Sequence, residues 1–370
     1  MKVLQVLNEI KASGAETMIA TASHHFKEHN YEVHVLSTGE VVGSYASNLE
    51  ELNYKIKHLP YKRYWAFTSP MFLLKYYLYL KRNKFDVIHI HPERGYFAYA
   101  LIAKFAGVQR VVRTVHHIFP QGNNLKGYIL KPIKTFQRRV LKKMFKVVFT
   151  SNSSSGLNNE INTYKSKNLY LPNWYDEKKY SYDRNYNKNI IKESLGIKKD
   201  AIIYISLGGN WEYKNYDLII EAVNTIKDAV YIQIGPNNED LVKLKNKLKA
   251  NNVILLGKVN DPIPYLKSSD FYIMPSKLEG FGVAAVEAMA CGLPCVLSNR
   301  PALIDFKKLS NKIIFTEPNL VGVKNAISTS SKLTEDEKLE ISENMSKIAY
   351  ENFSSKIVVN QLIKLYENKN

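Results

Sequence analysis

Cysteine is scarce in this chain, and the two residues present do not indicate a disulfide framework or a metal site. Among 370 residues, only Cys291 and Cys295 occur. No histidine or further cysteine accompanies them at the spacing that a zinc or redox site needs. Both belong to a stretch of small apolar residues, so we expect them to pack as small hydrophobic side chains.

Long hydrophobic runs are also lacking. No window reaches the roughly 18 uninterrupted apolar residues of a membrane-spanning helix, and the apolar run in MKVLQVLNEIKASG is too short for a signal peptide. Hydrophobic residues make up 45% of the chain and charged residues 23%, which is typical of a soluble globular protein. A chain of this length is long enough to form two domains of ordinary size. We therefore expect a cytoplasmic protein of two domains.

Acidic residues are few in the first half of the chain. Residues 1–170 hold 25 Lys and Arg against 10 Asp and Glu, whereas residues 171–370 hold 27 against 24. Most of the formal net charge of +18 therefore belongs to the first half. This asymmetry indicates an anionic partner for that half alone, either a nucleic acid or a membrane surface rich in acidic lipid.

Apolar, β-branched strand-like runs alternate with helix-length segments in both halves. This alternation predicts an α/β protein with parallel sheets that are covered on both faces. A polar segment without clear periodicity begins at LPNW, so we place the domain boundary near Asn173. In each half the first strand is followed by a glycine-containing loop and a helix, as in a doubly wound unit. The fingerprint G-x-G-x-x-G is absent, which removes the main support for a dinucleotide cofactor.

The stretch EGFGVAAVEAMACGLPC, residues 279–295, places two acids eight residues apart. We expect a helix to begin near Gly282 or Val283, with the backbone N–H groups of Phe281, Gly282 and Val283 available to phosphate or sugar oxygens. Glu287 would lie inside the apolar face of that helix, where an unpaired charge is unfavourable and ribose hydroxyls could be its partners. From the residues alone, a solvated Glu279 and a lysine-paired Glu287 remain an equal alternative.

The spacing Glu279, seven residues, Glu287 resembles the E-x7-E signature of the retaining glycosyltransferases of family 4. Weaker similarities extend over nearly the whole chain: SGAE, FDVIHIH, RTVHH, LPNW, YKNYDLIIEAV, LLGKV and YIMPSKLEGFG. The resemblance implies a GT-B fold, in which two Rossmann-like doubly wound domains face each other across a cleft. Residues 1–172 would form the acceptor side, residues 173–351 would bind the nucleotide-sugar donor, and a helix at about 352–370 would pack back onto the first domain.

The same resemblance implies the transfer of a hexose or N-acetylhexosamine from a nucleotide sugar with retained anomeric configuration. We expect this nucleotide sugar to be a UDP-sugar. Glu279 would position donor sugar hydroxyls, Glu287 would hold the ribose, and Lys214 would match the phosphate-binding lysine of the family. Neither a cofactor nor a metal ion is expected, and the sequence contains no D-x-D string. The family arginine five positions before Lys214 is Gly209 here, so either another basic residue, such as Lys258 or Lys277, supplies the missing charge or the diphosphate is held more loosely.

Further residues take roles through the resemblance. Gly14 matches a glycine loop that faces the donor phosphate and the acceptor, and Val259 lies where the family backbone contacts the base. His116 matches a histidine near the transferred sugar, although His117 follows directly and either ring could point inward. For His89 and His91, which alternate onto one strand face, we expect a structural role rather than a metal site, because no third ligand is at hand.

Two segments suggest a membrane-facing first domain. Residues 126–146 hold eight Lys and Arg with no acid, and apolar residues recur at helical spacing; residues 62–84 combine aromatics with basic residues at both ends. We expect a peripheral position on the inner face of the cell membrane and a lipid-linked or oligosaccharide acceptor. We also expect much of each apolar face to pack onto the sheet. In the alternative, both apolar faces do so completely and only the charges are exposed.

Two other functions remain open at this point. A basic nucleic-acid-binding protein would explain the charge but not the two acids, so we expect no nucleic acid partner. A GT-B sugar-nucleotide epimerase would share the donor site and need no acceptor. The glycosyl-transfer hypothesis itself requires that neither Glu279 nor Glu287 is locked to a lysine or arginine within the fold.

Overall fold

The computed structural model describes residues 1–11, 14–61, 63–64, 67–116, 125–236 and 238–367. The chain divides into two compact units, which we call unit 1 (Met1–Trp174 with Ser355–Asn370) and unit 2 (Tyr175–Ser354). Each unit is an α/β structure built on a parallel sheet, so the predicted fold class is confirmed. The positions of the units relative to one another are not determined, and each is described by itself.

Unit 1 contains a seven-stranded sheet in the order β3-β2-β1-β6-β7-β8-β9, in which every pair is parallel. Its strands are β1 Lys2–Leu7, β2 Glu32–Ser37, β3 Lys55–His58, β6 Val87–Ile90, β7 Arg110–Val115, β8 Val148–Ser151 and β9 Leu169–Tyr170. A separate antiparallel pair is formed by β4 Arg63–Tyr64 and β5 Phe67–Thr68. The inner strands are almost completely buried because helices cover both faces of the sheet. Their apolar residues are interrupted by a few buried polar ones, such as Gln5 and His89.

One face of this sheet packs against α1 Gly14–Thr21, α2 Ser23–Glu28, α3 Ala46–Glu51 and α15 Ser355–Tyr366. The other face packs against α4 Pro70–Asn83, α5 Tyr96–Phe105 and α6 Leu125–Lys143. Helix α7 Ser154–Tyr164 follows β8. Successive residues of β1 point to opposite faces of the sheet. Val3 belongs to the hydrophobic cluster that contains α15, and Leu4 belongs to the cluster that contains α4 and α5.

Unit 2 contains a six-stranded parallel sheet in the order β12-β11-β10-β13-β14-β15. Its strands are β10 Ile202–Leu207, β11 Ala229–Ile234, β12 Val253–Gly257, β13 Phe271–Met274, β14 Cys295–Ser298 and β15 Ile314–Thr316. Its helices are α8 Asn189–Ser194, η1 Glu212–Lys214, α9 Tyr216–Val223, α10 Glu239–Leu248, α11 Ile263–Ser268, α12 Val283–Ala290, η2 Ile304–Lys308, α13 Leu320–Ser330 and α14 Glu335–Phe353. Two core clusters again lie on opposite faces.

The chain leaves unit 2 through α14 and ends in unit 1 as α15, where the sequence predicts a helix at about 352–370. Thr334 and Glu337 form a capping box that starts α14. Ser354, in extended conformation, separates α14 from α15. Tyr366 of α15 is buried against the unit 1 sheet, so the last helix is part of the core of that unit. Among the described residues, no helix is long and apolar enough to cross a membrane.

Both sheets reverse their strand order once, between β1 and β6 in unit 1 and between β10 and β13 in unit 2. At such a switch point, loops at the carboxyl ends of the strands diverge and leave room for a ligand. The loops after β10 and β13 carry Lys214 and Glu279, respectively. In unit 1, His91 and His116 directly follow β6 and β7. The predicted site residues are therefore gathered at the edges where open α/β sheets bind ligands.

Candidate active site

Lys214 and Glu279 form an ion pair at the switch point of the unit 2 sheet. Lys214 is the last residue of η1, and Glu279 lies in the loop between β13 and α12. The lysine Nζ donates to Glu279 Oε1 at 2.5 Å. The two side chains are only 13% and 12% exposed, so the pair is screened by water much less than an ordinary surface ion pair.

The two loops that carry this pair are tied to each other by hydrogen bonds. Asn215 adopts a left-handed conformation and donates from Nδ2 to the carbonyl oxygen of Pro275 at 2.8 Å. The backbone N–H of Lys277 donates to the carbonyl oxygen of Tyr213 at 2.7 Å. The distance between the lysine and the acid is therefore fixed by the backbone, as a preorganised electrostatic site requires.

The expectation that neither acid pairs with a lysine or arginine is wrong for Glu279. Its partner is Lys214, which the sequence assigns to the same site as the ligand of the donor phosphate. A ligand with a diphosphate could compete with the carboxylate for this lysine, because both are anions that accept from an ammonium group. The pair therefore brings two predicted site residues together, and it leaves Lys214 neutralised when no anion is bound.

Helix α12 begins directly beyond this pair. Gly282 is its N-cap with φ of +100°, and a Cβ there would approach Leu303 Cδ2 to 2.8 Å, so only glycine fits without strain. The N–H groups of Ala285 and Val286 bond back to the Gly282 carbonyl oxygen. Within the described part of the chain, nothing accepts from the N–H groups of Gly282 and Val283.

Phe281 anchors the loop before α12 through its side chain. Its buried ring packs edge-on against Phe353 and at a tilt against Phe306. This packing leaves the backbone of Phe281 and Gly282 at the start of the helix, where the macrodipole favours an anion.

Glu287 is the fifth residue of α12 and lies among apolar neighbours. Burial raises its pKa to about 7, while the Lys179 charge and a hydrogen bond from Tyr180 act in the opposite direction. Tyr180 is itself buried and reaches the acid from the segment that enters unit 2. The sequence identifies Glu287 but not Tyr180, because that segment has no periodicity and suggests only a connection.

Replacing Glu287 with Gln is expected to change the pH dependence of stability. The folded pKa of about 7 lies above the ordinary 4.5, so folding favours the protonated acid. The acid therefore increasingly lowers the free energy of unfolding as pH rises from 4.5 to 7. Between about pH 5 and about pH 8, wild type loses on the order of 1–3 kcal/mol relative to Glu287→Gln. Urea unfolding of both proteins measures this difference; a difference independent of pH contradicts the shifted pKa.

The other predicted residues of unit 2 are located as follows. At Gly209 a Cβ would contact Trp211 Nε1 at 3.3 Å and Pro236 Cγ at 3.4 Å, so the loop leaves little room for a side chain there. Lys258 and Lys277 are both exposed. Val259 is half-buried and packs against the core cluster that contains α12.

In unit 1, His116 is held by His91. Its Nε2 lies 2.8 Å from His91 Nδ1, and the two rings are stacked with their centroids 5.1 Å apart. His117 lies outside the described residues. Both ring nitrogens of His89 bond to protein groups, Tyr366 and Thr114, as a structural role predicts.

Gly14 starts α1 in unit 1. A Cβ on this residue would meet no atom of the described residues within 4 Å. Local packing therefore gives no reason for a glycine at this position, and the approach of a ligand remains a prediction.

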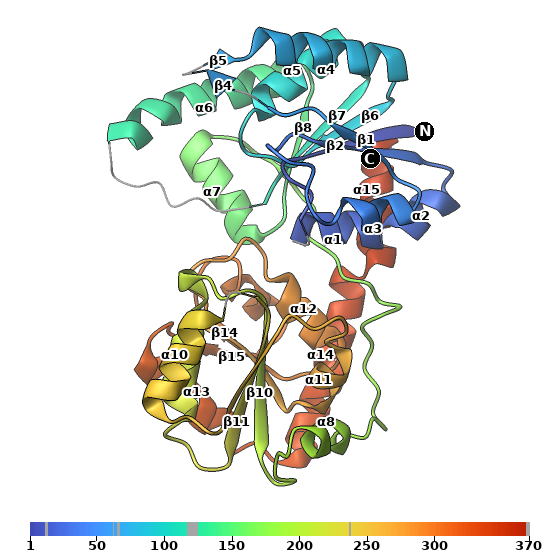
Figure 1. Ribbon diagram of the computed structural model, residues 1–370. Helices are drawn as coiled ribbons and strands as arrows, with labels where there is room; N and C mark the ends of the chain where they lie inside the picture. The colour runs from blue at the N-terminus through green and yellow to red at the C-terminus, as the bar shows by residue number, and fades with distance from the viewer. Residues whose placement is uncertain (12–13, 62, 65–66, 117–124, 237, 368–370) are drawn as a thin grey trace. The chain divides into compact units, whose positions relative to one another are not determined.

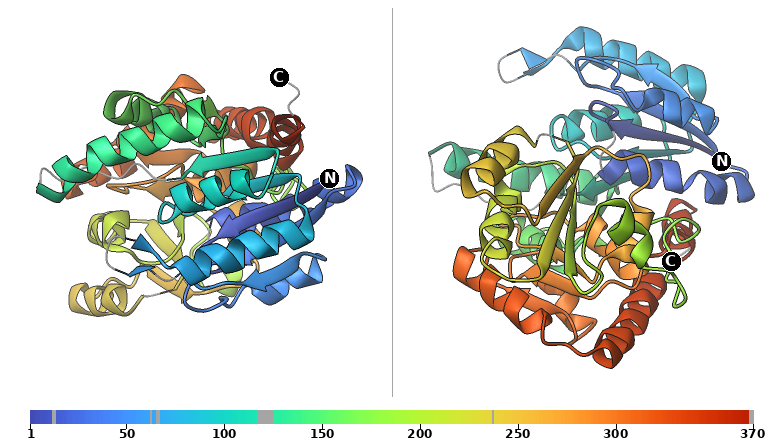
Figure 2. Two further views of the ribbon diagram at one scale, coloured as in Figure 1. Left: turned by 90° about the horizontal axis from the view of Figure 1, so that it is seen from above. Right: turned by 60° about the horizontal axis from the view of Figure 1, so that its bottom comes forward.

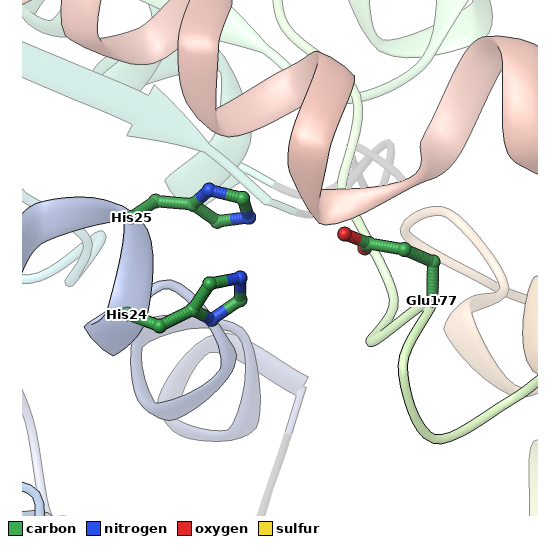
Figure 3. A group of neighbouring side chains, drawn as sticks. All are labelled: His24, His25 and Glu177. Carbon is green, nitrogen blue, oxygen red and sulfur yellow. The ribbon is translucent and has the colours of Figure 1, made fainter. Parts of the chain in front are cut away.

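One group of potential metal ligands occurs in the described part of the chain: His24, His25 and Glu177 (Figure 3). The rings of His24 and His25 on α2 lie 3.8 Å apart, and His25 Nε2 is within 2.9 Å of Ser355 Oγ. Glu177 belongs to unit 2, whose position relative to unit 1 is not determined. The three residues therefore define no metal centre.

Comparison with protein families agrees with this arrangement. The model described as "Glycosyltransferase Family 4" matches residues 12–157, and the model described as "Glycosyl transferases group 1" matches residues 187–352. Anabaena Alr3699/HepE, solved in complex with UDP, has a similar fold, with a TM-score of 0.81, 18% identity and full coverage of both chains. The chain is thus a glycosyltransferase with the GT-B fold.

Two relatives with named activities are similar to this chain in sequence. UDP-Gal:alpha-D-GlcNAc-diphosphoundecaprenol alpha-1,3-galactosyltransferase of Escherichia coli is 30% identical over 256 residues, which span 61% of each chain. N,N'-diacetylbacillosaminyl-diphospho-undecaprenol alpha-1,3-N-acetylgalactosaminyltransferase of Campylobacter jejuni is 24% identical over 342 residues, 87% of this chain and 88% of the relative. The protein belongs to glycosyltransferase family 4, together with enzymes of bacterial polysaccharide and lipid-linked sugar biosynthesis.

Proposed function

We propose that this protein is a retaining, metal-independent hexosyltransferase of surface polysaccharide assembly. It moves a hexose or N-acetylhexosamine from a UDP-sugar to a lipid-linked or glycan acceptor. The observation that carries the proposal is the shielded Lys214–Glu279 pair at the start of α12, with Glu287 on the same helix. A cation, helix-start amides and two acids are the groups that a diphosphate, a ribose and a hexose need.

The donor binds along the start of α12 in this proposal. Lys214 and the N–H groups of Gly282 and Val283 bind the diphosphate, because cations and free helix-start amides stabilise phosphate charge. Glu287 accepts from the ribose hydroxyls, and Glu279 accepts from hydroxyls of the sugar. Uracil as the base is supported by the UDP-sugar named as donor of the E. coli relative and by the UDP bound to the Anabaena protein.

In this proposal, residues outside the start of α12 complete the donor site. The backbone at Val259 contacts the base, and Gly14 allows close approach to the donor phosphate. His116 contacts a hydroxyl of the transferred sugar and shapes the reacting face. These roles follow the pattern of the glycosyltransferase family to which the chain belongs.

Transfer proceeds by attack on the face from which the leaving group departs. The bond between the anomeric carbon and the β-phosphate oxygen breaks, and the acceptor oxygen bonds to that carbon on the same face. The proton of the acceptor hydroxyl goes to the departing phosphate oxygen, so no protein base is required. Lys214 and the helix-start amides stabilise the negative charge that grows on the diphosphate. This assignment needs no metal ion, and the sequence has no D-x-D string to hold one.

A panel of nucleotide sugars tests the proposal. Purified protein is incubated with UDP- and GDP-sugars, with and without a lipid-diphosphate-linked sugar acceptor and with a chelator present. We expect a glycosylated acceptor whose new linkage keeps the anomeric configuration of the donor. Release of an epimerised sugar without an acceptor would instead identify an epimerase. Filter binding to RNA without any nucleotide-sugar turnover would favour the nucleic-acid alternative.

The acceptor side is proposed to rest on an anionic membrane through α4 and α6. Both helices flank α5 on one face of unit 1 (Figures 1 and 2). Met71, Leu74 and Leu78 recur along an exposed face of α4, opposite the buried Phe72 and Tyr76. On α6, Ile133 and Phe136 are 48% and 64% exposed beside basic residues. The alternative in which these apolar faces pack onto the sheet is wrong for these positions.

Helix α6 is nevertheless firmly attached to unit 1. Arg138 donates from Nε to Glu160 Oε2 of α7 at 2.8 Å and from NH2 to Oε1 at 3.0 Å, and both residues are buried. Further along the helix, Leu141 is fully buried in the sheet core. The exposed apolar residues are therefore presented by an anchored helix and not by a loose one, as a membrane-docking surface requires.

Reversing charge on α6 is expected to weaken vesicle binding. In Lys131→Glu/Arg139→Glu, two exposed basic residues become acidic, and each basic residue near an anionic surface contributes about 1 kcal/mol. Cosedimentation with vesicles containing anionic lipid is expected to fall at least roughly tenfold. The matched variant Lys243→Glu/Lys247→Glu on α10 keeps wild-type binding. Equal losses in both variants, or none in either, contradict the docking surface.

A further inference from the structure

Glu93, in the loop between β6 and α5 of unit 1, is held by two cations. Its Oε2 accepts from Arg113 Nη2 at 2.6 Å, and its Oε1 accepts from Lys134 Nζ of α6 at 3.2 Å. Arg113 is buried in β7, and its Nη1 also donates to the carbonyl oxygen of His91 at 3.0 Å. Burial acts to raise the pKa of Glu93, but the positive charges around the acid outweigh it and lower the pKa below its usual value. The acid is therefore ionised and bound at both oxygens.

The charges of this cluster do not cancel. The cations Arg113, Lys134 and Arg138 share two acids, Glu93 and Glu160, so three positive charges meet two negative ones and leave +1. The two arginine side chains are only 2% and 3% exposed, so each depends on its acid for compensation. The Lys134 side chain is 31% exposed. The uncompensated charge therefore belongs to the lysine, at the surface.

Lys134 is fixed in place and still has donors to spare. An ammonium group carries three N–H donors, and among the described residues only Glu93 accepts from this one. The lysine is not needed to attach α6, because Arg138 and Leu141 already hold that helix to unit 1. Two N–H groups of a positioned cation are thus available to an anion from outside.

The start of α5 lies beside this part of α6. Tyr96, the first residue of α5, donates from its hydroxyl to Gln137 Oε1 at 3.2 Å and accepts from Arg138 Nη1 at 3.1 Å. In the part of the chain that the structure describes, no group accepts from the N–H groups of Tyr96 and Phe97. The positive end of the α5 dipole therefore adds to the charge of the cluster and favours an anion there.

Exposed apolar side chains of α6 border the same charge. Leu130, Ile133 and Phe136 are all exposed and lie within about one helical turn of Lys134. A single ligand can use both features if it joins phosphate groups to a hydrocarbon chain, because the phosphates bind the ammonium group and the chain covers the apolar residues.

We propose that Lys134, held by Glu93, binds the diphosphate of a prenyl-diphosphate-linked acceptor whose hydrocarbon chain lies along the exposed apolar residues of α6. The inference rests on the function proposed above, since it names the group by which that acceptor is recognised. The acceptor sugar then lies toward the carboxyl end of β6, because Glu93 follows that strand.

Titration with geranyl diphosphate tests the site without a sugar donor. This short prenyl diphosphate dissolves in water, so membrane docking does not contribute. Full-length Lys214→Met is the parent protein, because it lacks the cation that is proposed to bind the donor diphosphate in unit 2. Adding Lys134→Met is expected to weaken binding at least roughly tenfold. Adding Lys134→Arg is expected to restore most of the affinity, because a guanidinium group also binds phosphates.

Two controls accompany the titration. Lys27→Met removes an exposed lysine of α2, on the opposite face of the unit 1 sheet, and is expected to keep the affinity of the parent. Geraniol, which has no phosphate, is expected to bind the parent and Lys134→Met equally. Absence of diphosphate binding by the parent, an unchanged affinity in Lys134→Met, or an equal loss in Lys27→Met overturns the proposal.

A phospholipid headgroup is the other source of phosphate on a membrane, and vesicles distinguish it. Lys134→Met is expected to keep most of the cosedimentation of wild type with anionic vesicles, since the lysine is only partly exposed. If this variant instead loses vesicle binding and keeps its affinity for geranyl diphosphate, the lysine binds a headgroup and the proposal is wrong.

Kinetics with a lipid-diphosphate-linked acceptor give a second readout. Lys134→Met in the otherwise wild-type protein is expected to raise the acceptor KM at least roughly tenfold and to leave the donor KM unchanged. Equal increases of both KM values indicate a general structural role and overturn the proposal. Absence of transfer in wild type, with geranyl diphosphate binding that still depends on Lys134, counts against the proposed function and not against this site.

Discussion

Glu279→Ala is expected to lower kcat for sugar transfer by roughly 10²-fold or more, because its contact with the sugar strengthens in the transition state. The same change is expected to tighten UDP binding by about threefold to tenfold, since the loss of one partly screened ion pair is worth around 1 kcal/mol. Lys214 loses the carboxylate that neutralises it and becomes available to the diphosphate. Steady-state kinetics and a UDP titration measure the two effects.

A lower kcat together with tighter UDP binding distinguishes this result from simple damage to the fold, which would weaken both activity and binding. Glu279→Gln keeps an accepting oxygen and is expected to fall between wild type and Glu279→Ala in kcat. Glu212→Gln is the matched control, because Glu212 is an exposed acid in the same short helix as Lys214. Wild-type kcat in Glu279→Ala contradicts the assignment of this acid to the sugar.

Lys214→Met is expected to lower kcat/KM by roughly 10³-fold, about 4 kcal/mol of transition-state stabilisation. Methionine keeps the length of the side chain but removes the cation that offsets the charge of the leaving diphosphate. It also leaves Glu279, only 12% exposed, without its ion-pair partner and facing the incoming phosphate. UDP binding is therefore expected to weaken, in contrast to Glu279→Ala.

Lys214→Arg restores charge with a different geometry and is expected to recover part of kcat/KM. Lys247→Met, on the exposed face of α10, is the control for loss of a lysine from unit 2. In the double variant Lys214→Met/Glu279→Ala the losses are expected to be less than additive, because the two residues act on one group of the substrate. Additive losses, or an unaffected Lys214→Met, speak against a shared site.

The architecture could be predicted because its causes are local. Largely apolar runs such as those of β10 and β13 are buried on both faces of a parallel sheet, and this burial is visible in the sequence as a short run of mostly apolar residues. The helix start near Gly282 follows from a glycine between a strand and a run of small residues. The acids at 279 and 287 are identified through the resemblance of their spacing to the family signature, which is readable because both positions lie within one loop and helix.

Interactions between distant parts of the chain could not be predicted. Lys214 and Glu279 are 65 positions apart, and their pairing depends on how the loops after β10 and β13 are joined through Asn215. The same holds for Tyr180, whose contact with Glu287 comes from a segment without periodicity. On α6, sequence spacing identifies an amphipathic helix, but only the packing shows that Phe136 stays exposed while Arg138 is buried.

The central claim, that Lys214, Glu279 and Glu287 bind the donor at the start of α12, is tested most directly by calorimetric titration of the nucleoside diphosphate. UDP and GDP are titrated into wild type, and the one that binds is titrated into the variants. Lys214→Met and Glu287→Ala are expected to bind at least roughly tenfold more weakly, and Glu279→Ala more tightly. Identical affinities in wild type and all three variants would contradict the account.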